Sequence, residues 1–214
     1  MMENIFGKKD ETIGEKFKQI LRGGDKEPIE KKVILAHYKV KGSISRIDGY
    51  IGRLEQRDKE LFQTIIDSLI KRDDRRAKMY AREVAEIRKI SKQLLTVRYA
   101  LEQVALKLET FLVFGGAISD LKQIVGIMRE AVNITKPLAP DVWIDLQYAL
   151  KELETSLTAG LAGFAAELDV GLDTEAKKVL EEAKLAAEQS IKERYAELPK
   201  LLGEEVKDEA KATT

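Results

Sequence analysis

Cysteine and histidine, which supply many of the nucleophiles, proton carriers and metal ligands of proteins, are almost absent from this chain of 214 residues. The chain contains no cysteine, which excludes a thiolate nucleophile, a disulfide framework, an iron–sulfur cluster and a cysteine zinc site. His37 is the only histidine, which excludes multi-histidine zinc and di-iron centres. It lies inside an unbroken helical pattern with no nucleophile elbow nearby, so we interpret His37 as a core or interface residue.

Three other features contain residue types found in active sites but lack the context that the chemistry needs. Asp73 and Asp74 are adjacent carboxylates in a charged turn, without the buried pocket of a glycosidase. Gly115 and Gly116 belong to no dinucleotide or Walker-type phosphate motif. Trp143 lies on an apolar helix face and is interpreted as a packing residue. The sequence therefore predicts no catalytic residue, no metal site, no cofactor and no enzyme activity.

The charged residues are more informative, because they are sorted along the chain. The formal net charge is zero, yet residues 1–110 hold 25 Lys and Arg against 18 Asp and Glu, while residues 111–214 hold 12 against 19. Such asymmetry predicts a basic surface for an anionic partner and an acidic segment that covers it or reaches another subunit. The simpler interpretation is that charged helix faces need not balance locally.

Basic residues are concentrated in residues 71–98, which hold ten Lys and Arg against four Asp and Glu. Each such residue near an anionic bilayer contributes about 1 kcal/mol of binding free energy. Nucleic acid would also accept this surface, but the interleaved aromatic residues that stack on single strands are missing, so we expect anionic lipid and no nucleic acid. The residues assigned to membrane contact here are Arg72, Arg75, Arg76, Lys78 and Arg82.

The extreme N-terminus is a second predicted membrane contact, in which an apolar wedge precedes a basic anchor. Its residues are Met1, Met2, Ile5, Phe6, Lys8 and Lys9. No apolar core of a signal peptide is present, and the longest uncharged run, Thr155–Ala166, has 12 residues against the ~20 that span a bilayer. We therefore expect a cytoplasmic protein that lies peripherally on a membrane.

Helical periodicity predicts an all-α scaffold for these residues. Apolar residues recur at alternating spacings of three and four from Val33 to Ile70 and from Tyr80 to Phe111, which is the pattern of a heptad seam. Asp58 is the one conspicuous lapse in this pattern, and Asp73 or Asp74 can cap the second helix. Two long heptad helices joined by a few polar residues predict an antiparallel helical hairpin, about 65 Å long.

Shorter amphipathic helices are predicted on either side of this hairpin. They cover residues 13–22, 118–132, a helix capped by Asp141 that runs to Phe164, and an acidic helix over 174–198. Hinges are expected at Gly115, Gly116, Pro137 and Pro140, because the periodicity breaks there. The predicted organisation is a membrane-contacting segment (1–24), a basic hairpin with a third helix (25–135), hinged acidic helices (136–198) and a polar tail (199–214).

The order of these parts resembles the ESCRT-III superfamily, and within it the archaeal CdvB-type cell-division proteins. The resemblance covers roughly residues 1–198 and rests on the Ile-Phe-Gly-Lys-Lys segment at 5–9, the basic hairpin, the hinged helices and the acidic C-terminal helix. It implies filaments of this chain and its paralogues that polymerise on anionic membrane and constrict or sever membrane necks in cell division. It also implies a position on the inner face of the cell membrane at the division site, and an AAA ATPase of the CdvC type that remodels the polymer.

Two departures from that family pattern qualify the resemblance. The ATPase is usually recruited through a proline-rich or leucine-rich C-terminal motif, and the best match here consists of Leu198, Pro199, Leu201 and Leu202. We also expect this chain to lack the winged-helix-like tail of the longer division protein, because the sequence ends at Thr214. We therefore expect one of the shorter paralogues, which a preceding ring recruits.

The sorted charges lead to a hypothesis of regulation, in which the acidic helix 174–198 folds against the basic hairpin and blocks lateral contacts. Swinging at the hinges would then open the chain for assembly. Two alternatives share the helical fold. A cytosolic coiled-coil scaffold without a membrane role explains the heptads equally well, but not the N-terminal wedge or the polarity of charge. A PspA-like membrane-maintenance protein shares the fold and the membrane partner but has a different physiology.

Overall fold

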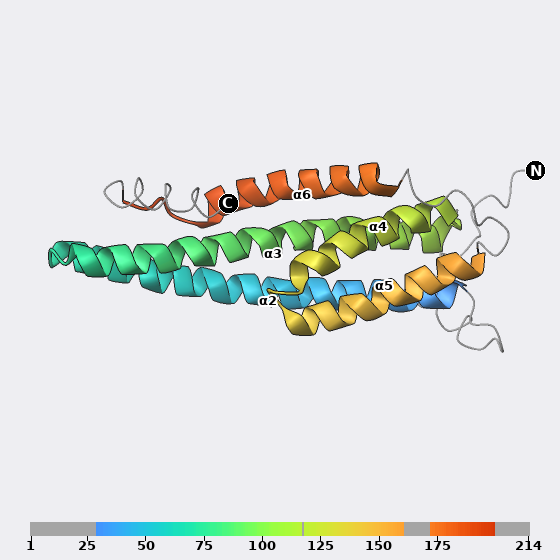
Figure 1. Ribbon diagram of the computed structural model, residues 1–214, viewed down its shortest axis with the longest axis horizontal. Helices are drawn as coiled ribbons and strands as arrows, with labels where there is room; N and C mark the ends of the chain where they lie inside the picture. The colour runs from blue at the N-terminus through green and yellow to red at the C-terminus, as the bar shows by residue number, and fades with distance from the viewer. Residues whose placement is uncertain (1–28, 117, 161–171, 200–214) are drawn as a thin grey trace, which may run out of the picture.

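The computed structural model describes residues 29–116, 118–160 and 172–199, and within these ranges the regular secondary structure is entirely α-helical (Figure 1). The predicted N-terminal helix at 13–22 lies outside the described residues. The five helices are α2 (Ile29–Ile70), α3 (Asp74–Phe114), α4 (Ile118–Thr135), α5 (Pro140–Gly160) and α6 (Leu172–Arg194). This confirms the all-α fold class and the succession of one long hairpin and three shorter helices.

Helices α2 and α3 form the predicted hairpin, with 42 and 41 residues respectively. A helix of this length extends about 63 Å. The heptad seam is buried as expected, since Val40, Ile47, Leu94 and Leu101 are almost completely inaccessible to solvent. The turn is short because Arg72 adopts a left-handed conformation (φ 57°) and the Asp73 N–H donates to the Ser68 carbonyl at 2.9 Å. The Asp73 carboxylate then accepts from the Arg76 N–H at 3.0 Å, which confirms Asp73 as the cap of α3.

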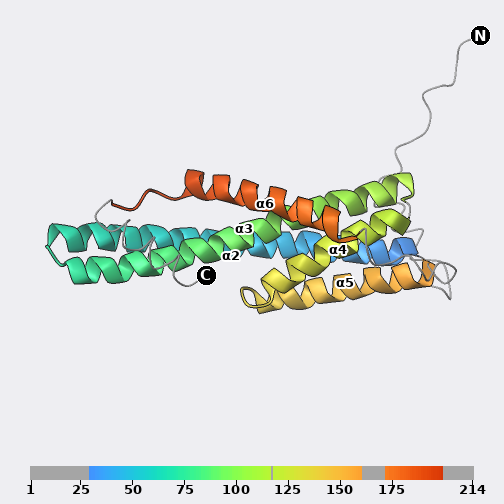
Figure 2. The same cartoon turned by 45° about the horizontal axis from the view of Figure 1, so that its top comes forward.

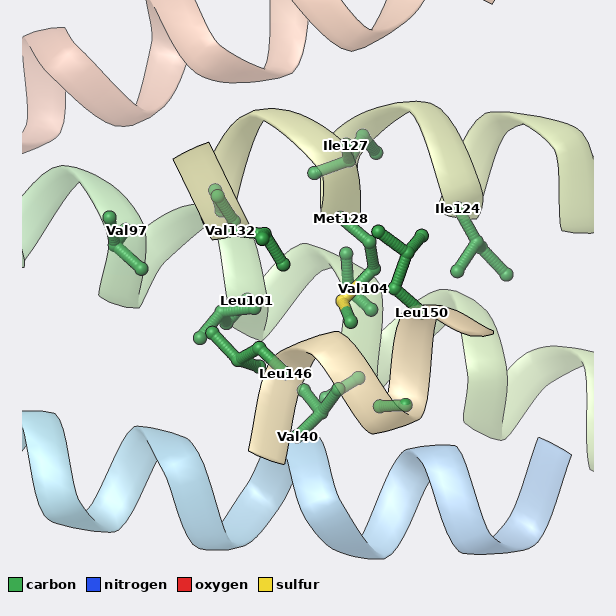
Figure 3. Packing of buried hydrophobic residues seen from close by; sticks show 14 of the residues in the cluster. Val40, Val97, Leu101, Val104, Ile124, Ile127, Met128, Val132, Leu146 and Leu150 are labelled. Carbon is green, nitrogen blue, oxygen red and sulfur yellow. The ribbon is translucent and has the colours of Figure 1, made fainter. Parts of the chain in front are cut away.

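The three shorter helices pack around the half of the hairpin that contains its two open ends. Helix α4 folds back over α3, α5 lies along α2, and α6 lies along α3 (Figures 1 and 2). All five described helices contribute to one apolar core. Val40 of α2, Leu101 of α3, Met128 of α4 and Leu146 of α5 come together in it (Figure 3), and α6 adds Ala176, Leu180, Ala183 and Ala187. We call this part of the molecule the base.

The remaining half of the hairpin is a two-helix arm that ends in the turn. Its own cluster is small and consists of Leu61, Ile65, Ala77, Ala81, Val84 and Ile87. Alanines close to the turn allow the two helix backbones to approach, while the larger aliphatic residues fill the seam nearer the base. We call residues 54–90 the arm, and its last part, residues 70–82, the tip.

Some predicted boundaries are wrong by a few residues. Helix α3 continues through Phe111, where the pattern seemed to break, and ends at Phe114 because Gly115 takes the left-handed conformation (φ 73°) that closes a helix. Helix α5 begins at Pro140, whose fixed φ suits the first helical position, so Asp141 lies in the first turn and is not the cap. The predicted continuation of this helix to Phe164 passes beyond the described residues after Gly160.

Candidate interaction surfaces

The tip of the arm brings together the five basic residues that the sequence assigned to membrane contact. Arg72 lies in the turn, and Arg75, Arg76, Lys78 and Arg82 follow on the first turns of α3, all of them exposed. The last four line an open hollow of about 690 Å³ together with Asp73, Met79 and Tyr80. An anion that approaches this end of the molecule therefore meets several cations at once.

Two exposed apolar side chains at the tip were missed by the sequence analysis. Ile70 is 75% exposed and Met79 is 56% exposed, although both belong to helices with a buried seam. The predicted seam ran to Ile70, so its exposure shows that the buried seam ends before the last residue of α2. Met79 falls outside the three-four spacing of the seam, which was the available signal. Apolar side chains beside a basic cluster give the tip an amphipathic character.

Helix α3 beyond the tip is less basic than the sequence predicted, because most of its cations are already paired. Arg88 binds Asp58, Lys92 Nζ lies 2.6 Å from Glu188, and Arg98 Nε lies 2.5 Å from Asp48. The basic residues of 71–98 therefore do not form one unpaired basic surface along α3. The accessible basic surface is concentrated at the tip.

Asp58, the apparent lapse in the heptad pattern, forms a buried ion pair. The Arg88 guanidinium donates to both carboxylate oxygens, at 2.7 and 3.0 Å, and Asp58 is only 3% exposed. A signal for this pair was present in the sequence. In a hairpin that turns at residues 71–73, Asp58 and Arg88 are at nearly equal distances from the turn along the two helices. A bidentate pair in the seam fixes the register of the two helices.

Helix α6 is docked on the hairpin through a small and partly polar interface. Its buried positions are mainly small residues, namely Ala176, Leu180, Ala183, Ala187 and Ser190. Glu188 pairs with Lys92, whose hydrogen bond lowers the pKa of that carboxyl. Arg194 Nη1 lies 2.6 Å from Glu55 of α2. The helix therefore buries less apolar surface per turn than a helix with a stripe of leucines.

Tyr195 secures the end of α6 beside the buried ion pair. Its hydroxyl donates to Ser91 Oγ at 2.7 Å, and the Arg88 guanidinium lies 5.3 Å from the centre of its ring. Burial raises the pKa of the Tyr195 hydroxyl above its usual value. Three residues further on, Leu198 packs against the small cluster of the arm.

Helix α5 is held against α2 by acidic side chains on its inner edge. Asp145 binds both Arg46 and Lys39, the latter at 3.2 Å, and Asp141 accepts from the Tyr50 hydroxyl at 2.7 Å. Burial alone would raise the pKa of Asp145, but the hydrogen bonds from Arg46 and Lys39 lower it. The acidic second half of the chain is thus folded onto the basic first half.

The predicted hinges are tight turns in this conformation. A Cβ atom at Gly116 would overlap the Phe111 ring, so any other residue there would require this ring to move. Between α4 and α5 the Leu138 and Ala139 N–H groups both donate to the Thr135 carbonyl, and Ala139 is fully buried. Pro137 lies in that turn and Pro140 begins α5. Whether either turn moves remains a prediction from the sequence.

The structure places the other predicted site residues as follows. Leu198 and Pro199 belong to the described chain, and both are half-buried. Leu201 and Leu202 lie outside the described residues, as do the N-terminal contacts Met1, Met2, Ile5, Phe6, Lys8 and Lys9. The described side chains include no group of His, Asp and Glu that could hold a metal ion. Among the described helices, none has the length and apolarity needed to cross a membrane.

A long antiparallel hairpin followed by shorter helices is the arrangement expected of an ESCRT-III-like protein. The chain is 38% identical over 195 residues to Cell division protein B1 of Sulfolobus acidocaldarius, an alignment that covers 87% of this chain and 91% of that relative. It is 32% identical over 172 residues to Cell division protein B of the same organism, covering 80% of this chain and 66% of the relative. The chain therefore belongs to the archaeal CdvB family of ESCRT-III-type proteins. No family model and no solved structure matches it.

Proposed function

We propose that this chain is a filament subunit of the archaeal division machinery, which polymerises on anionic membrane and drives constriction or scission. Two curated relatives are named cell division proteins, and one of them aligns along most of both chains. The observation that carries the proposal is the exposed basic tip with Ile70 and Met79 beside it. Such a surface binds a bilayer by charge with a small apolar contribution, and needs no enclosed pocket.

The proposed partners follow from this role. They are copies of the same chain, paralogous subunits, anionic lipids on the inner face of the cell membrane at the division site, and an AAA ATPase of the CdvC type that remodels the polymer. Catalysis by the chain itself is not part of the proposal. Weak binding by each subunit is sufficient, because a filament presents many tips to one membrane and the free energies add.

Membrane binding is tested by flotation with vesicles of anionic or neutral lipid at low and high salt. The triple variant Arg72→Glu, Arg75→Glu, Arg76→Glu should lose binding to anionic vesicles. Its matched control, Lys178→Glu, Lys184→Glu, Lys192→Glu, changes the charge equally on the exposed side of α6. Binding to neutral vesicles as strong as to anionic ones would contradict the electrostatic part. If Phe6→Asp loses binding to anionic vesicles while the triple variant keeps it, the membrane contact belongs to the N-terminus instead of the tip.

The docked α6 supports a regulated form of assembly, in which removing this helix exposes the face of α3 around Ser91 and Lys92. Deleting residues 171–214 should promote assembly at low salt, as measured by sedimentation. A deletion variant that stays monomeric would contradict this part. Assembly without vesicle binding would instead favour the alternative of a coiled-coil scaffold.

A further inference from the structure

The end of α3 that lies in the base has an apolar stripe that neither core covers. It consists of residues on one face of the helix, namely Leu106, Thr110, Val113 and Phe114. Phe114 is 82% exposed, the largest fraction for any large apolar side chain of the described chain. Among the described residues, neither the core of the base nor the cluster of the arm includes an apolar residue of this stripe. We call these four residues the open-end stripe.

The open-end stripe continues the line along which α6 is docked. The Tyr99 hydroxyl donates to Ser190 Oγ of α6 at 3.3 Å, and Gln103 lines a small hollow together with residues of α6. The stripe follows Gln103 at the same spacing of three and four residues, so it lies on the same face of α3. It is therefore the part of a helix-docking face that stays exposed in the described chain.

Residues 1–28, which precede α2, join the described chain beside this stripe. Because Asp58 pairs with Arg88, residues at equal distances from the turn lie opposite each other in the hairpin. The first turn of α2, which begins at Ile29, therefore lies opposite Phe114. Figure 1 shows these two helix ends at the same end of the molecule. A segment that precedes Ile29 therefore starts within reach of the stripe.

The predicted N-terminal helix at 13–22 has the length and the apolar face to cover the stripe. Its apolar residues share one face and are Ile13, Phe17, Ile20 and Leu21. The rise from Ile13 to Leu21 is about 12 Å, the same as that from Leu106 to Phe114. Residues 22–28 reach about 23 Å when extended, whereas the axes of packed helices lie only about 8–10 Å apart. The helix can therefore lie along α3 while it stays joined to α2.

The charges of the two segments are complementary. Residues 13–22 contain three Lys and Arg against one Glu, whereas residues 99–120 contain one Lys against three Asp and Glu. Glu109 borders the stripe and makes no ion pair with another residue of the described chain. The apolar face and the charge of residues 13–22 therefore both match this part of α3.

We propose that the open-end stripe is the docking site of the chain's own helix at residues 13–22. Ile20 and Leu21 cover Val113 and Phe114, and the cations of the helix lie near the acids of α3. The docked helix keeps its apolar face out of water when no membrane is present. The stripe and a bilayer then compete for this face, a consequence that rests on the proposed function. The docking itself requires no membrane.

The reactivity of single cysteines in the full-length protein without lipid tests this assignment, because the chain has no cysteine of its own. Ile20→Cys places a thiol on the docked face, and Gln19→Cys places one about 100° away around the same helix. Docking shields the first thiol, so Gln19→Cys should react with dithiobis(nitrobenzoic acid) at least ~tenfold faster than Ile20→Cys. Equal rates in the two variants would overturn the proposal.

Two further substitutions assign the shielding to the stripe. Val113→Ser with Phe114→Ser, added to the Ile20→Cys protein, should make its thiol react as fast as that of Gln19→Cys. Both side chains are exposed, so the hairpin should still fold. The matched control adds Ile144→Ser with Tyr148→Ser, which are exposed on α5, and should leave the shielding unchanged. Shielding that survives the change at the stripe would show that the helix does not rest there.

Dilution and vesicle flotation separate the remaining outcomes. Shielding that weakens when the protein is diluted would assign the stripe to a second copy of the chain and overturn docking within one chain, which does not depend on concentration. With anionic vesicles, the variant Val113→Ser, Phe114→Ser should float in a larger fraction than the unchanged protein, because its helix is free. If the protein fails to float, the proposed function is contradicted, while the docking measured without lipid still stands.

Discussion

The base and the arm of the hairpin contain the same two helices but are stabilised in different ways. In the base, α2 and α3 are covered by α4, α5 and α6, and a continuous apolar core joins all five described helices. Figure 3 shows part of this core. In the arm, six buried apolar residues and the Asp58–Arg88 pair are the main internal contacts between the two helices. Apolar burial therefore dominates the base, while the arm depends more on pairing in register.

This difference suits the two parts to different tasks. A large core tolerates the motion of one covering helix, because the others keep the structure together. A two-helix arm has little core to lose and presents most of its surface to solvent, which makes that surface available to partners. The base is therefore the part that a large core stabilises, and the proposed function assigns the contacts with membrane and other subunits to the arm. The following predictions test how independent the two parts are.

The largest effect is expected from a cavity in the base. Leu101 is completely buried in the core of the base, so Leu101→Ala should lower the free energy of unfolding by about 4 kcal/mol through lost burial and the residual cavity. Urea denaturation measures this loss. Leu106→Ala is the control on the same helix, because Leu106 is 58% exposed and its truncation should change stability by less than about 0.5 kcal/mol. Similar losses in the two variants would contradict the packing described for the base.

Breaking the buried ion pair should have the next largest effect, and should act mainly on the arm. Asp58→Ala leaves the Arg88 guanidinium without its partner at a site where it is mostly buried, at a cost of about 3 kcal/mol. Hydrogen exchange should show faster opening of residues 54–90 and little change in the base. The double variant Asp58→Leu, Arg88→Leu should recover most of the loss, since an apolar pair needs no compensation. Faster exchange throughout the molecule would show that arm and base unfold together.

The same contrast explains how much of this molecule could be predicted from the sequence. The hairpin, its turn and the Asp73 cap follow from local patterns, because heptads and caps act over a few residues. The faces that α4, α5 and α6 select could not be predicted, since an amphipathic face does not specify which apolar surface it meets. The pairing of Lys92 was missed because its partner Glu188 lies on α6, 96 residues away. The partners of Arg88 and Arg98 lie at nearly equal distances from the turn, so the register of the hairpin could have predicted those two pairs.

A smaller effect is expected where α6 meets the arm. Tyr195→Ala removes the hydrogen bond to Ser91 and the ring beside Arg88, which should weaken the docking of α6 by about 2 kcal/mol. Hydrogen exchange should then increase in residues 172–194 while the core of the base keeps its protection. Tyr148→Ala is the control, since Tyr148 is a 59% exposed tyrosine on α5. If hydrogen exchange increases only in the last turn of α6, the other contacts of the helix hold it in place, and the prediction for Tyr195 is contradicted.

Two glycines on the outer face of α2 should allow a modest gain in stability. Nothing lies within 4 Å of a Cβ atom built on Gly42 or Gly52, so Gly42→Ala and Gly52→Ala should each stabilise the protein by about 0.8 kcal/mol through helix propensity. Gly115→Ala is the control of opposite sign, because its φ of 73° strains any residue with a side chain. A loss of stability at Gly42 or Gly52 would mean that this face of the base is covered in solution.

The smallest effect is expected from mild acid, and it should arise in the base. Nε2 of His37 is buried and has no hydrogen-bond partner among the described residues. Burial lowers the pKa of this imidazole below 6.5, although Glu109 partly opposes the shift. The unfolded chain therefore binds a proton more readily than the folded one below pH 6.5, so stability should fall as the pH decreases from about 7 to 5.5. In His37→Leu, urea unfolding should give the same stability at both pH values, since His37 is the only histidine. If the pH dependence persists in this variant, it arises from carboxylates such as Asp145, whose pairing with Arg46 and Lys39 is lost in acid.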